Sequence, residues 1–568
     1  MHSSPGTSRG AAVSSLAGLT ARLDRIACWI CVALFVAILL VMVMQVGFRY
    51  ALNAPLTWTE ELARFLYIWA CWLGAPVALR RGNHIAIAFV SDRVPRRAAG
   101  GHHAAYPVVG DLCCRSDIRR AHDPRDGAGH VARADAVGRG GRRVTVGPLI
   151  WMWLGLMVVG MPIFLSIGFA CLAYLWANGE ILLSVPQRLT ASANSFPLLA
   201  APFFMLTGMA MNTAGITTRI YDFCECLAGR FRGGLAHVNV IGSVVFAGMS
   251  GSAVADAAGL GTIEIKAMTD EGYPLPFAAA VTAASATVGP IIPPSVPLLI
   301  YGVIADVSIG RLFAGGFVPG LLMAGALMIM IRFMAHKHGF GAHRPPTFPE
   351  FVTKTRRAFL SLMTPVILFG GMMAGVFTPT EAAFAAAVYA LILGLFVYRE
   401  IKWRELPTLF LNTVETNAVV LMLVMTASLF GWVLARAQVP QMLGAWILGT
   451  TQNPILILLM LNVFLLVVGC FMEALAALII LVPVFMPVIK AVGIDPVHFG
   501  LVIVLNLMIG TLTPPVGIVL FVVARVAKLP FEVVTRATAP FLVPLIVVLL
   551  LITVFPELVL FLPRVIFG

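Results

Sequence analysis

Two short loops in this chain combine residue types that could bind a cation and an organic anion. GPIIPPS runs from Gly289 to Ser295 and GTLTPP runs from Gly510 to Pro515, and each lies inside a long apolar segment. A Pro-Pro pair removes backbone donors, so a helix stops there and leaves carbonyl groups without helical partners. Such carbonyls and nearby hydroxyls are the oxygen ligands that a hard cation such as Na⁺ prefers. The two breaks therefore predict an ion and substrate site.

The candidate ligands come from these breaks and from two polar runs that precede them. GMSGSAVADAAG, Gly248 to Gly259, precedes the first break, and Gly469 to Glu473 precedes the second. Asp256 and Glu473 are carboxylates within these runs, which either a role in the site or a solvated helix cap would explain. A single Ser or Thr in a membrane helix is more often a packing or back-bonded residue, so the paired loops carry the prediction as groups. The candidate site residues are Ser250, Gly251, Ser252, Asp256, Gly289, Ile291, Ile292, Pro293, Gly469, Glu473, Gly510, Thr511, Thr513 and Pro514.

The composition of the chain is that of a membrane protein. Of its 568 residues, 60% are hydrophobic and 11% are charged, with a mean hydropathy of +0.94. The net charge of +13 fits Lys and Arg on cytoplasmic loops, so we assign no nucleic-acid partner. The nine cysteines have no metal-ligand spacing and predict neither a zinc site nor a disulfide framework. We expect an all-α polytopic membrane protein that is not an enzyme and uses no organic cofactor, since no nucleophile and base pair is evident.

The apolar segments that must position the loops alternate between long and short. The pairs 235–249 with 253–269 and 455–470 with 474–490 are short and adjacent, as expected for re-entrant hairpins. The other expected segments are 26–48, 60–79, 148–176, 196–215, 276–305, 311–331, 358–377, 381–398, 407–435, 498–524 and 537–561. The turn FTPTE, Phe377 to Glu381, is expected to end in a helix N-terminus.

Two parts of the chain repeat the same order of elements. One constant offset in residue number, without gaps, superposes Gly248 on Gly469, Gly289 on Gly510 and the two Pro-Pro pairs on each other. The basic residues fall at opposite ends of the two parts, so the repeats are expected to have opposite orientations in the membrane. This pattern predicts inverted repeats, about 196–331 and 407–561, each with a re-entrant hairpin and a discontinuous helix.

The N-terminal part has a different organisation. Residues 1–95 are expected to form a membrane hairpin with a cytoplasmic N-terminus, and the charge pattern then places the C-terminus in the periplasm. Residues 96–147 are rich in Arg, Gly and Ala and contain no Lys. Either a disordered basic linker or a stretch translated out of frame would explain this composition, and we favour the second. The large remaining part, 148–568, contains both breaks.

Several motifs resemble those of the tripartite ATP-independent periplasmic (TRAP) transporters, in a form that fuses the small and large membrane subunits. They are GPIIPPSV (Gly289 to Val296), GMSGSAVADAAGLG (Gly248 to Gly261), TPTEAA (Thr378 to Ala383), GTLTPPVG (Gly510 to Gly517), WTEELARFLYIWACWLG (Trp58 to Gly74) and RRGNHIAI (Arg81 to Ile87). The resemblance implies sodium-coupled, elevator-type uptake of an organic acid, a dicarboxylate or other carboxylate, across a bacterial inner membrane. It also implies a periplasmic binding protein that delivers the substrate. The small subunit of the family has four helices, whereas only two are readable here.

Two other classes of protein remain open at the level of the sequence. A sodium–carboxylate symporter that works without a binding protein shares the logic of inverted repeats and broken helices. The hairpin in residues 1–95 argues against it. A channel is a further alternative, but the breaks lie beside hairpins instead of forming a ring around a pore.

Overall fold

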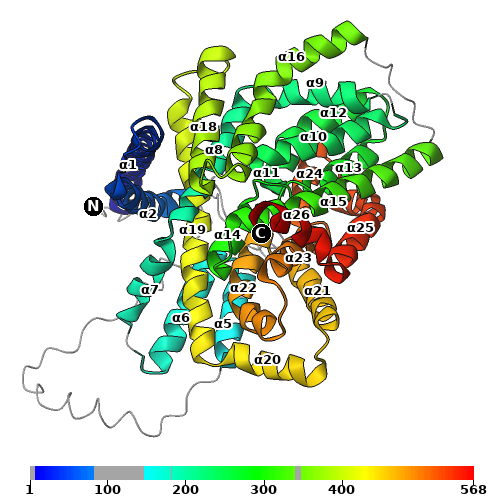
Figure 1. Ribbon diagram of the computed structural model, residues 1–568. Helices are drawn as coiled ribbons and strands as arrows, with labels where there is room; N and C mark the ends of the chain where they lie inside the picture. The colour runs from blue at the N-terminus through cyan, green and yellow to red at the C-terminus, as the bar shows by residue number, and fades with distance from the viewer. Residues whose placement is uncertain (1–6, 55, 82–145, 181, 230, 339–346) are drawn as a thin grey trace, which may run out of the picture. The chain divides into compact units, whose positions relative to one another are not determined.

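The structure is a computed structural model that describes residues 7–54, 56–81, 146–180, 182–229, 231–338 and 347–568, without the side chains of 7–19 and 247–250. The described residues form helices joined by turns and short loops (Figure 1). Among them, nine helices are long and apolar enough to cross a membrane. The predicted fold class, an all-α polytopic membrane protein with discontinuous helices, is confirmed. Residues 96–145 of the expected linker lie outside the described residues.

The chain divides into two compact units, and the smaller one comprises residues 86–182. Within it, α5 (Val146–Val158) and α6 (Ile163–Ala177) pack against each other. The prediction of one continuous segment over 148–176 is therefore wrong. Gly160 has φ +91°, and the Met161 N–H donates to the Leu156 carbonyl, which is the pattern of a helix ending at a left-handed glycine. Pro162 follows and cannot continue the helix.

The larger unit, residues 1–85 and 183–568, begins with the predicted hairpin. Its helices α1 (Thr7–Ala51) and α2 (Thr57–Arg80) pack along each other. Both also pack on α19 (Leu406–Arg436), and α1 contacts α18 (Pro379–Ile392) as well. The hairpin is therefore an integral part of this unit.

The first repeat contains the expected short pair and broken helix. Helix α10 enters the hairpin, Gly251 in the left-handed conformation ends it, and α11 and α12 return. The broken helix stops at Ala286 and resumes at Val296, so the prediction of a discontinuous helix over 276–305 is confirmed. The elements are η1 (Phe196–Leu199), α8 (Ala200–Thr213), α9 (Ile216–Ala228), α10 (Gly234–Ser250), α11 (Ala253–Ala258), α12 (Leu260–Asp270), α13 (Leu275–Ala286), α14 (Val296–Ala305) and α15 (Ile309–His338).

The second repeat follows the same order. Its broken helix stops at Gly510 and resumes at Ile518, as predicted for 498–524. Both breaks contain a cis peptide bond between their two prolines. The final segment, expected over 537–561, is wrong as a single helix because it ends at Val554, before Pro556. After α19, the elements are α20 (Val439–Thr450), α21 (Pro454–Phe471), α22 (Ala474–Ala491), α23 (Pro496–Gly510), α24 (Ile518–Ala527), α25 (Phe531–Val554) and α26 (Glu557–Phe567).

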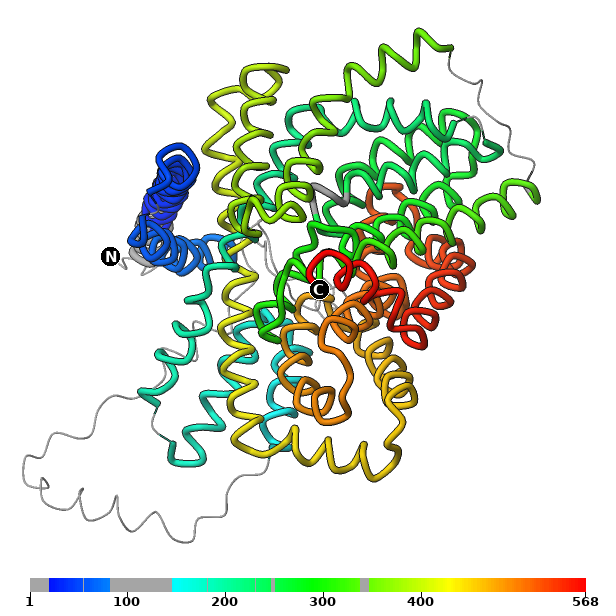
Figure 2. Tube along the Cα trace, viewed as in Figure 1, coloured from blue at the N-terminus to red at the C-terminus, as the bar shows by residue number. Residues whose placement is uncertain are grey.

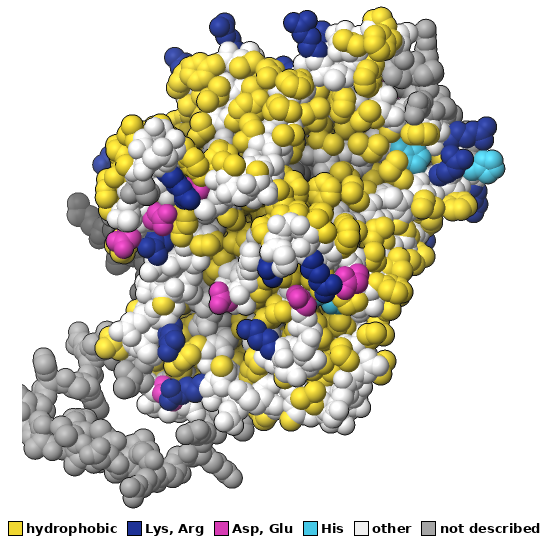
Figure 3. Space-filling view, in the orientation of Figure 1, with side chains coloured by type: hydrophobic (Ala, Val, Ile, Leu, Met, Phe, Trp, Pro, Cys, Tyr) yellow, Lys and Arg dark blue, Asp and Glu magenta, His cyan; other side chains and the backbone are white. Residues whose placement is uncertain are grey.

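Helices α16 (Phe348–Pro365) and α18 lie between the two repeats in the chain. Helix α18 starts with the capping box expected from FTPTE: the Thr378 hydroxyl accepts from the Glu381 N–H, and the Glu381 carboxylate accepts from the Thr378 N–H. Apolar side chains cover much of the visible surface (Figure 3), and Trp29, Trp69 and Val463 are among the exposed large ones. An exposed apolar surface of this extent fits contact with lipid instead of water.

Candidate functional site

The tip of the first hairpin lies directly against the first break, residues 287–295. Gly251 has φ +58°, and a Cβ there would lie 2.7 Å from the Pro294 carbonyl oxygen. Ser252 follows in an extended conformation and caps α11, because its hydroxyl accepts from the Ala255 N–H. A glycine at 251 is thus required both for the turn and for the close approach. The side chain of Ser250 lies outside the described residues.

Asp256 lies on α11 and faces the start of the first break. Its side chain is 2% exposed, and a Cβ on Gly289 would lie 3.0 Å from its Oδ2 atom. The interpretation of Asp256 as a solvated cap is therefore wrong. A buried carboxylate beside the backbone of a broken helix is positioned where a cation could neutralise it.

Part of the interior of the first break contacts other protein groups. The Ser295 hydroxyl donates to the Pro290 carbonyl and accepts from the Leu298 N–H at 3.1 Å, which caps α14. The Ile291 carbonyl contacts Gly316 of α15, and the Ile292 side chain contacts Gly320. Of the predicted backbone ligands, Ile291 thus faces α15, and the break packs tightly on that helix.

The second hairpin meets the second break, residues 511–517, in an equivalent way. A Cβ on Gly510 would lie 2.6 Å from the Gly469 Cα, and the Val516 N–H donates to the Cys470 carbonyl at 3.2 Å. Glu473 caps α22 by accepting from the Ala476 N–H at 3.0 Å. The backbones at the tip and at the break touch because both positions are glycine.

The two hydroxyls predicted in the second break are back-bonded. Thr511 donates to the Met508 carbonyl at 2.6 Å, and Thr513 donates to the Gly510 carbonyl at 2.8 Å. Each donation uses the hydroxyl proton and leaves oxygen lone pairs that can accept a cation. The back-bonded role that we weighed for single hydroxyls is thus present, and it is chemically compatible with ligation.

The constant offset between the repeats recurs in the contacts themselves. Ser252 accepts from Ala255 at the first tip, and Glu473 accepts from Ala476 at the second. The two acceptors are separated by the same number of residues as Gly248 and Gly469, and so are the two donors. The two tips are therefore built by the same local geometry with different capping side chains.

The two repeats interlock around the breaks. Helix α24, which follows the second break, packs on α11 and α13 of the first repeat. Helix α14, which follows the first break, packs on α22 and α23 of the second (Figure 2). The Tyr301 hydroxyl donates to the Pro496 carbonyl at 2.6 Å across this junction. Reciprocal packing thus brings both tips and both breaks into one region of the larger unit.

The two breaks differ in their exposure. Pro293 and Pro294 are buried, whereas Pro514 and Pro515 are exposed. The residue types are matched, so the difference comes from the surroundings: Gly316 and Gly320 let α15 approach the first break. The region is therefore accessible at the second break in this structure.

Buried amide networks hold each hairpin to its broken helix, and they were not predicted from the sequence. In the first repeat, Asn239 of α10 donates to Thr282 at 2.7 Å and accepts from Ser285 at 2.5 Å. In the second, Asn506 of α23 donates to the Asn462 side chain of α21 at 3.0 Å. Polar residues in apolar helices were the available signal, because a buried amide needs a partner.

Comparisons with known proteins agree with this architecture. The sequence profile of the "Tripartite ATP-independent periplasmic transporter, DctM component" family matches residues 149–558. The profile of the "Tripartite ATP-independent periplasmic transporters, DctQ component" family matches residues 38–114.

Three curated relatives are covered over most of their own length. The chain is 49% identical over 420 residues to the sialic acid TRAP transporter large permease protein SiaM of Vibrio cholerae, covering 74% of this chain and 98% of SiaM. It is 35% identical over 608 residues to the sialic acid TRAP transporter permease protein SiaT of Haemophilus influenzae, covering 94% and 98%. It is also 35% identical over 595 residues to the isethionate TRAP transporter permease protein DctMQ of Oleidesulfovibrio alaskensis, covering 93% of each.

One solved structure shares the fold. The YdaH transporter of Alcanivorax borkumensis aligns with a TM-score of 0.50 at 16% identity, covering 72% of this chain and 97% of that one. At this identity the likeness concerns the fold alone.

Proposed function

From the premise that this chain belongs to the TRAP transporter permeases, with small and large membrane components in one chain, we propose that it carries out sodium-coupled uptake of an organic acid. The chain is a multi-pass membrane permease for secondary uptake and not an enzyme. Three parts of this proposal go beyond membership of the family: the coupling ion, the class of substrate and the delivery of the substrate by a binding protein.

The observation that carries the proposal is the pairing of each hairpin tip with its own break. Gly251 lies against Pro294, and Gly469 lies against Gly510. In addition, α14 and α24 each pack on helices of the other repeat. Sodium would be held by the carbonyls of the breaks together with Thr511, Thr513, Ser252 and Asp256. Oxygen ligands with few charges suit this ion, since a hard cation in a membrane needs oxygens but little net charge.

The N-terminus of α24 is the proposed place of the organic anion. In the part of the chain that the structure describes, no side chain caps that helix, and its first residues follow the exposed Pro514 and Pro515. Uncapped N–H groups and the helix dipole attract carboxylates. Sialic acid and isethionate, the substrates in the names of the three relatives, and C4-dicarboxylates, the substrates in the name of a 38% identical large permease protein of Pseudomonas aeruginosa, are all anions, which supports an anionic substrate here.

The proposal includes a periplasmic binding protein as the source of substrate and an elevator-type movement of the interlocked repeats. Reciprocal packing supports movement as one body, because the hairpins cannot separate from the broken helices without losing buried contacts. The N-terminus would lie in the cytoplasm and the C-terminus in the periplasm of a bacterial inner-membrane protein. The alternative of a symporter without a binding protein predicts the same site.

Uptake by proteoliposomes tests these steps separately. The full chain is reconstituted and offered radiolabelled sialic acid or a C4-dicarboxylate, with or without a sodium gradient and with or without a periplasmic binding protein that binds the same substrate. We expect uptake only when both the gradient and the binding protein are present. Uptake without the binding protein would favour the symporter, and equal uptake without sodium would overturn the coupling.

The variant Asp256→Asn tests the ion site within the same assay. The amide keeps the shape and removes the charge beside Gly289, so we expect the sodium concentration for half-maximal uptake to rise at least tenfold. Glu271→Gln in the loop after α12 is the matched control and should leave sodium activation unchanged. Unchanged sodium activation in Asp256→Asn would remove Asp256 from the site.

A further inference from the structure

Glu264 of α12 carries a carboxyl group that is buried inside the first hairpin. The residue is 1% exposed, and its Oε1 atom has no hydrogen-bond partner among the described residues. A Cβ on Gly242 of α10 would lie 3.2 Å from this Oε1 atom, so the carboxyl group lies against the backbone of α10. Helices α10, α11, α13 and α24 all pack on α12. The carboxyl group is therefore enclosed by protein and removed from water.

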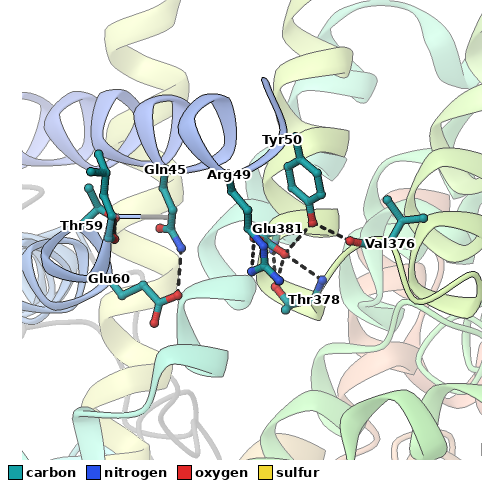
Figure 4. Close-up of polar contacts among 9 residues, drawn as sticks. Gln45, Arg49, Tyr50, Thr59, Glu60, Val376, Thr378 and Glu381 are labelled. Carbon is teal, nitrogen blue, oxygen red and sulfur yellow. Dashed lines mark hydrogen bonds and ion pairs between the residues drawn. The ribbon is translucent and has the colours of Figure 1, made fainter. Parts of the chain in front are cut away.

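Two other buried glutamates show what a carboxylate charge requires in this protein. Glu381 is 1% exposed and pairs with Arg49 at 2.8 Å (Figure 4). Glu415 is likewise 1% exposed and pairs with Arg81 at 2.7 Å. Each of these two charges thus has a cationic partner, and a buried carboxylate without one is costly.

The groups that act on Glu264 supply no such partner. The charged group that acts on it is a second acid, Asp256 of α11. Tyr221 and Cys224 of α9 also interact with it electrostatically. The Tyr221 hydroxyl, like the Glu264 Oε1 atom, is buried without a hydrogen-bond partner in the part of the chain that the structure describes. These neighbours are an acid, a phenol and a thiol, so none of them neutralises a carboxylate.

The helices packed on α12 supply no cation to Glu264 either. Helix α13 carries no titratable side chain. His237 is the titratable residue of α10 and Arg525 is that of α24, and neither acts on Glu264. A carboxyl group in these surroundings is stable in its neutral form, because the proton removes the charge that no neighbour compensates.

We propose that Glu264 is a proton-binding site, at which the first hairpin holds a neutral carboxylic acid. Protonation leaves Asp256 as the carboxylate that a cation in this hairpin would neutralise. Without the proton, the hairpin would carry two negative charges in an apolar setting. The proposal does not depend on which ion or substrate the permease carries.

Infrared spectroscopy of the full-length protein in detergent tests the binding directly. A protonated carboxyl group has a carbonyl band separate from that of a carboxylate, and we expect Glu264→Gln to remove one such band at about pH 7. Glu271→Gln is the matched control, because it alters an exposed glutamate at the end of the same helix and should remove none. Absence of a protonated band that is lost in Glu264→Gln would overturn the proposal.

Thermal unfolding at several pH values is the second measurement. The unfolded chain exposes the residue 264 side chain to water and releases its proton, so the folded protein binds more protons and its stability falls as the pH rises. Raising the pH from about 5 to about 9 should therefore lower Tm more in the wild type than in Glu264→Gln, which has no proton to lose there. Glu271→Gln should follow the wild type.

A carboxylate that bound an ion or a cationic side chain would give the opposite result. Glu264→Gln would then lower Tm, and would do so most at high pH, where the carboxylate is fully charged. If Glu264→Gln yields no folded protein, Glu264→Met supplies a neutral side chain of similar length for the same comparisons. Neither measurement uses sodium or substrate, so loss of sodium-coupled uptake would contradict the proposed function alone, and a missing band would contradict the proton site alone.

Discussion

At the scale of single residues, the two hairpin tips are distinguished by how they cap the returning helix. Ser252 uses a neutral hydroxyl and Glu473 uses a carboxylate oxygen for the same N–H position. A cap needs only an acceptor, whereas an ion site at the second tip would need the charge. Glu473 is therefore the residue at which capping and ion binding can be separated.

Replacing Glu473 with Gln or Ala makes this separation. The amide oxygen of Gln can still accept from Ala476, so Glu473→Gln should keep both stability and uptake if capping is the role. Glu473→Ala removes the acceptor and should lower the free energy of unfolding by about 1 kcal/mol. Denaturation in detergent and proteoliposome uptake measure the two effects. Loss of uptake in Glu473→Gln at unchanged stability would instead assign the charge to the site.

The first tip has its own comparison. Ser252→Ala removes the cap of α11 beside the first break and should cost about 1 kcal/mol of stability together with most of the uptake. Thr262→Ala removes an exposed hydroxyl that donates only to the Ala258 carbonyl in the same hairpin, and it should change neither. If both variants transport equally, the first tip does not depend on Ser252.

The residue types in the breaks were readable from the sequence, but their partners were not. Pro-Pro pairs inside apolar segments indicate where backbone carbonyl groups lose their helical partners, because proline lacks the N–H donor. The spacing of the motif residues did not indicate that the Ile291 carbonyl faces Gly316, or that Asp256 is buried against Gly289. Those contacts depend on how separate helices pack, and so the sequence left open whether Asp256 is buried or solvated.

At the scale of elements, the glycines at the second break decide how the hairpin and the broken helix approach each other. Gly510→Ala would place a Cβ 2.6 Å from the Gly469 Cα, where backbone meets backbone and neither can move aside. We expect a loss of about 1–3 kcal/mol in stability and loss of uptake. Thermal unfolding and uptake of the same preparation provide the measurement.

Gly325→Ala in α15 is the matched control for that substitution. A Cβ there meets no atom within 4 Å, so the change should stabilise the helix by about 0.5–1 kcal/mol and leave uptake intact. A Gly510→Ala protein that behaves like Gly325→Ala would show that the close approach is dispensable.

The elements themselves were predicted well where periodic apolar runs end at proline or glycine. Both short pairs and both broken helices were found this way. Where the apolar run continues through a turn, the prediction failed: residues 148–176 divide at Gly160, and the last segment ends before Pro556. The short helices α7 (Ser184–Ala193) and α20 were missed, because they are too short to cross a membrane and hydropathy alone does not separate them from loops.

At the scale of the whole molecule, the sequence repeat predicted two similar parts but not how they join. The packing of α14 and α24 on helices of the other repeat is a tertiary contact, as are the ion pairs Arg49–Glu381 and Arg81–Glu415. Partners so distant along the chain leave no signal in one sequence. The Glu381 motif predicted a turn and a helix start, and in the structure Glu381 also contacts the α1–α2 hairpin.

The junction between the repeats can be tested at Tyr301 and Gly500. Tyr301 of α14 is fully buried, and a Cβ on Gly500 of α23 would lie 2.5 Å from its ring. Gly500→Ala should therefore push the two repeats apart and cost about 1–3 kcal/mol. Tyr301→Ala removes the ring that the new methyl group meets, at the cost of a large cavity and of the hydrogen bond to Pro496.

If the repeats hold each other at this point, the two substitutions are not additive. The double variant should be more stable than the sum of the single losses predicts, by about 1 kcal/mol or more, because the methyl group enters the space that the ring has left. Tyr301→Phe separates the hydroxyl from the ring and should cost only about 1 kcal/mol. Additive losses in the cycle would mean that Tyr301 and Gly500 are not coupled, and the support between the repeats would then come from their other contacts, such as those of α24 with α11 and α13.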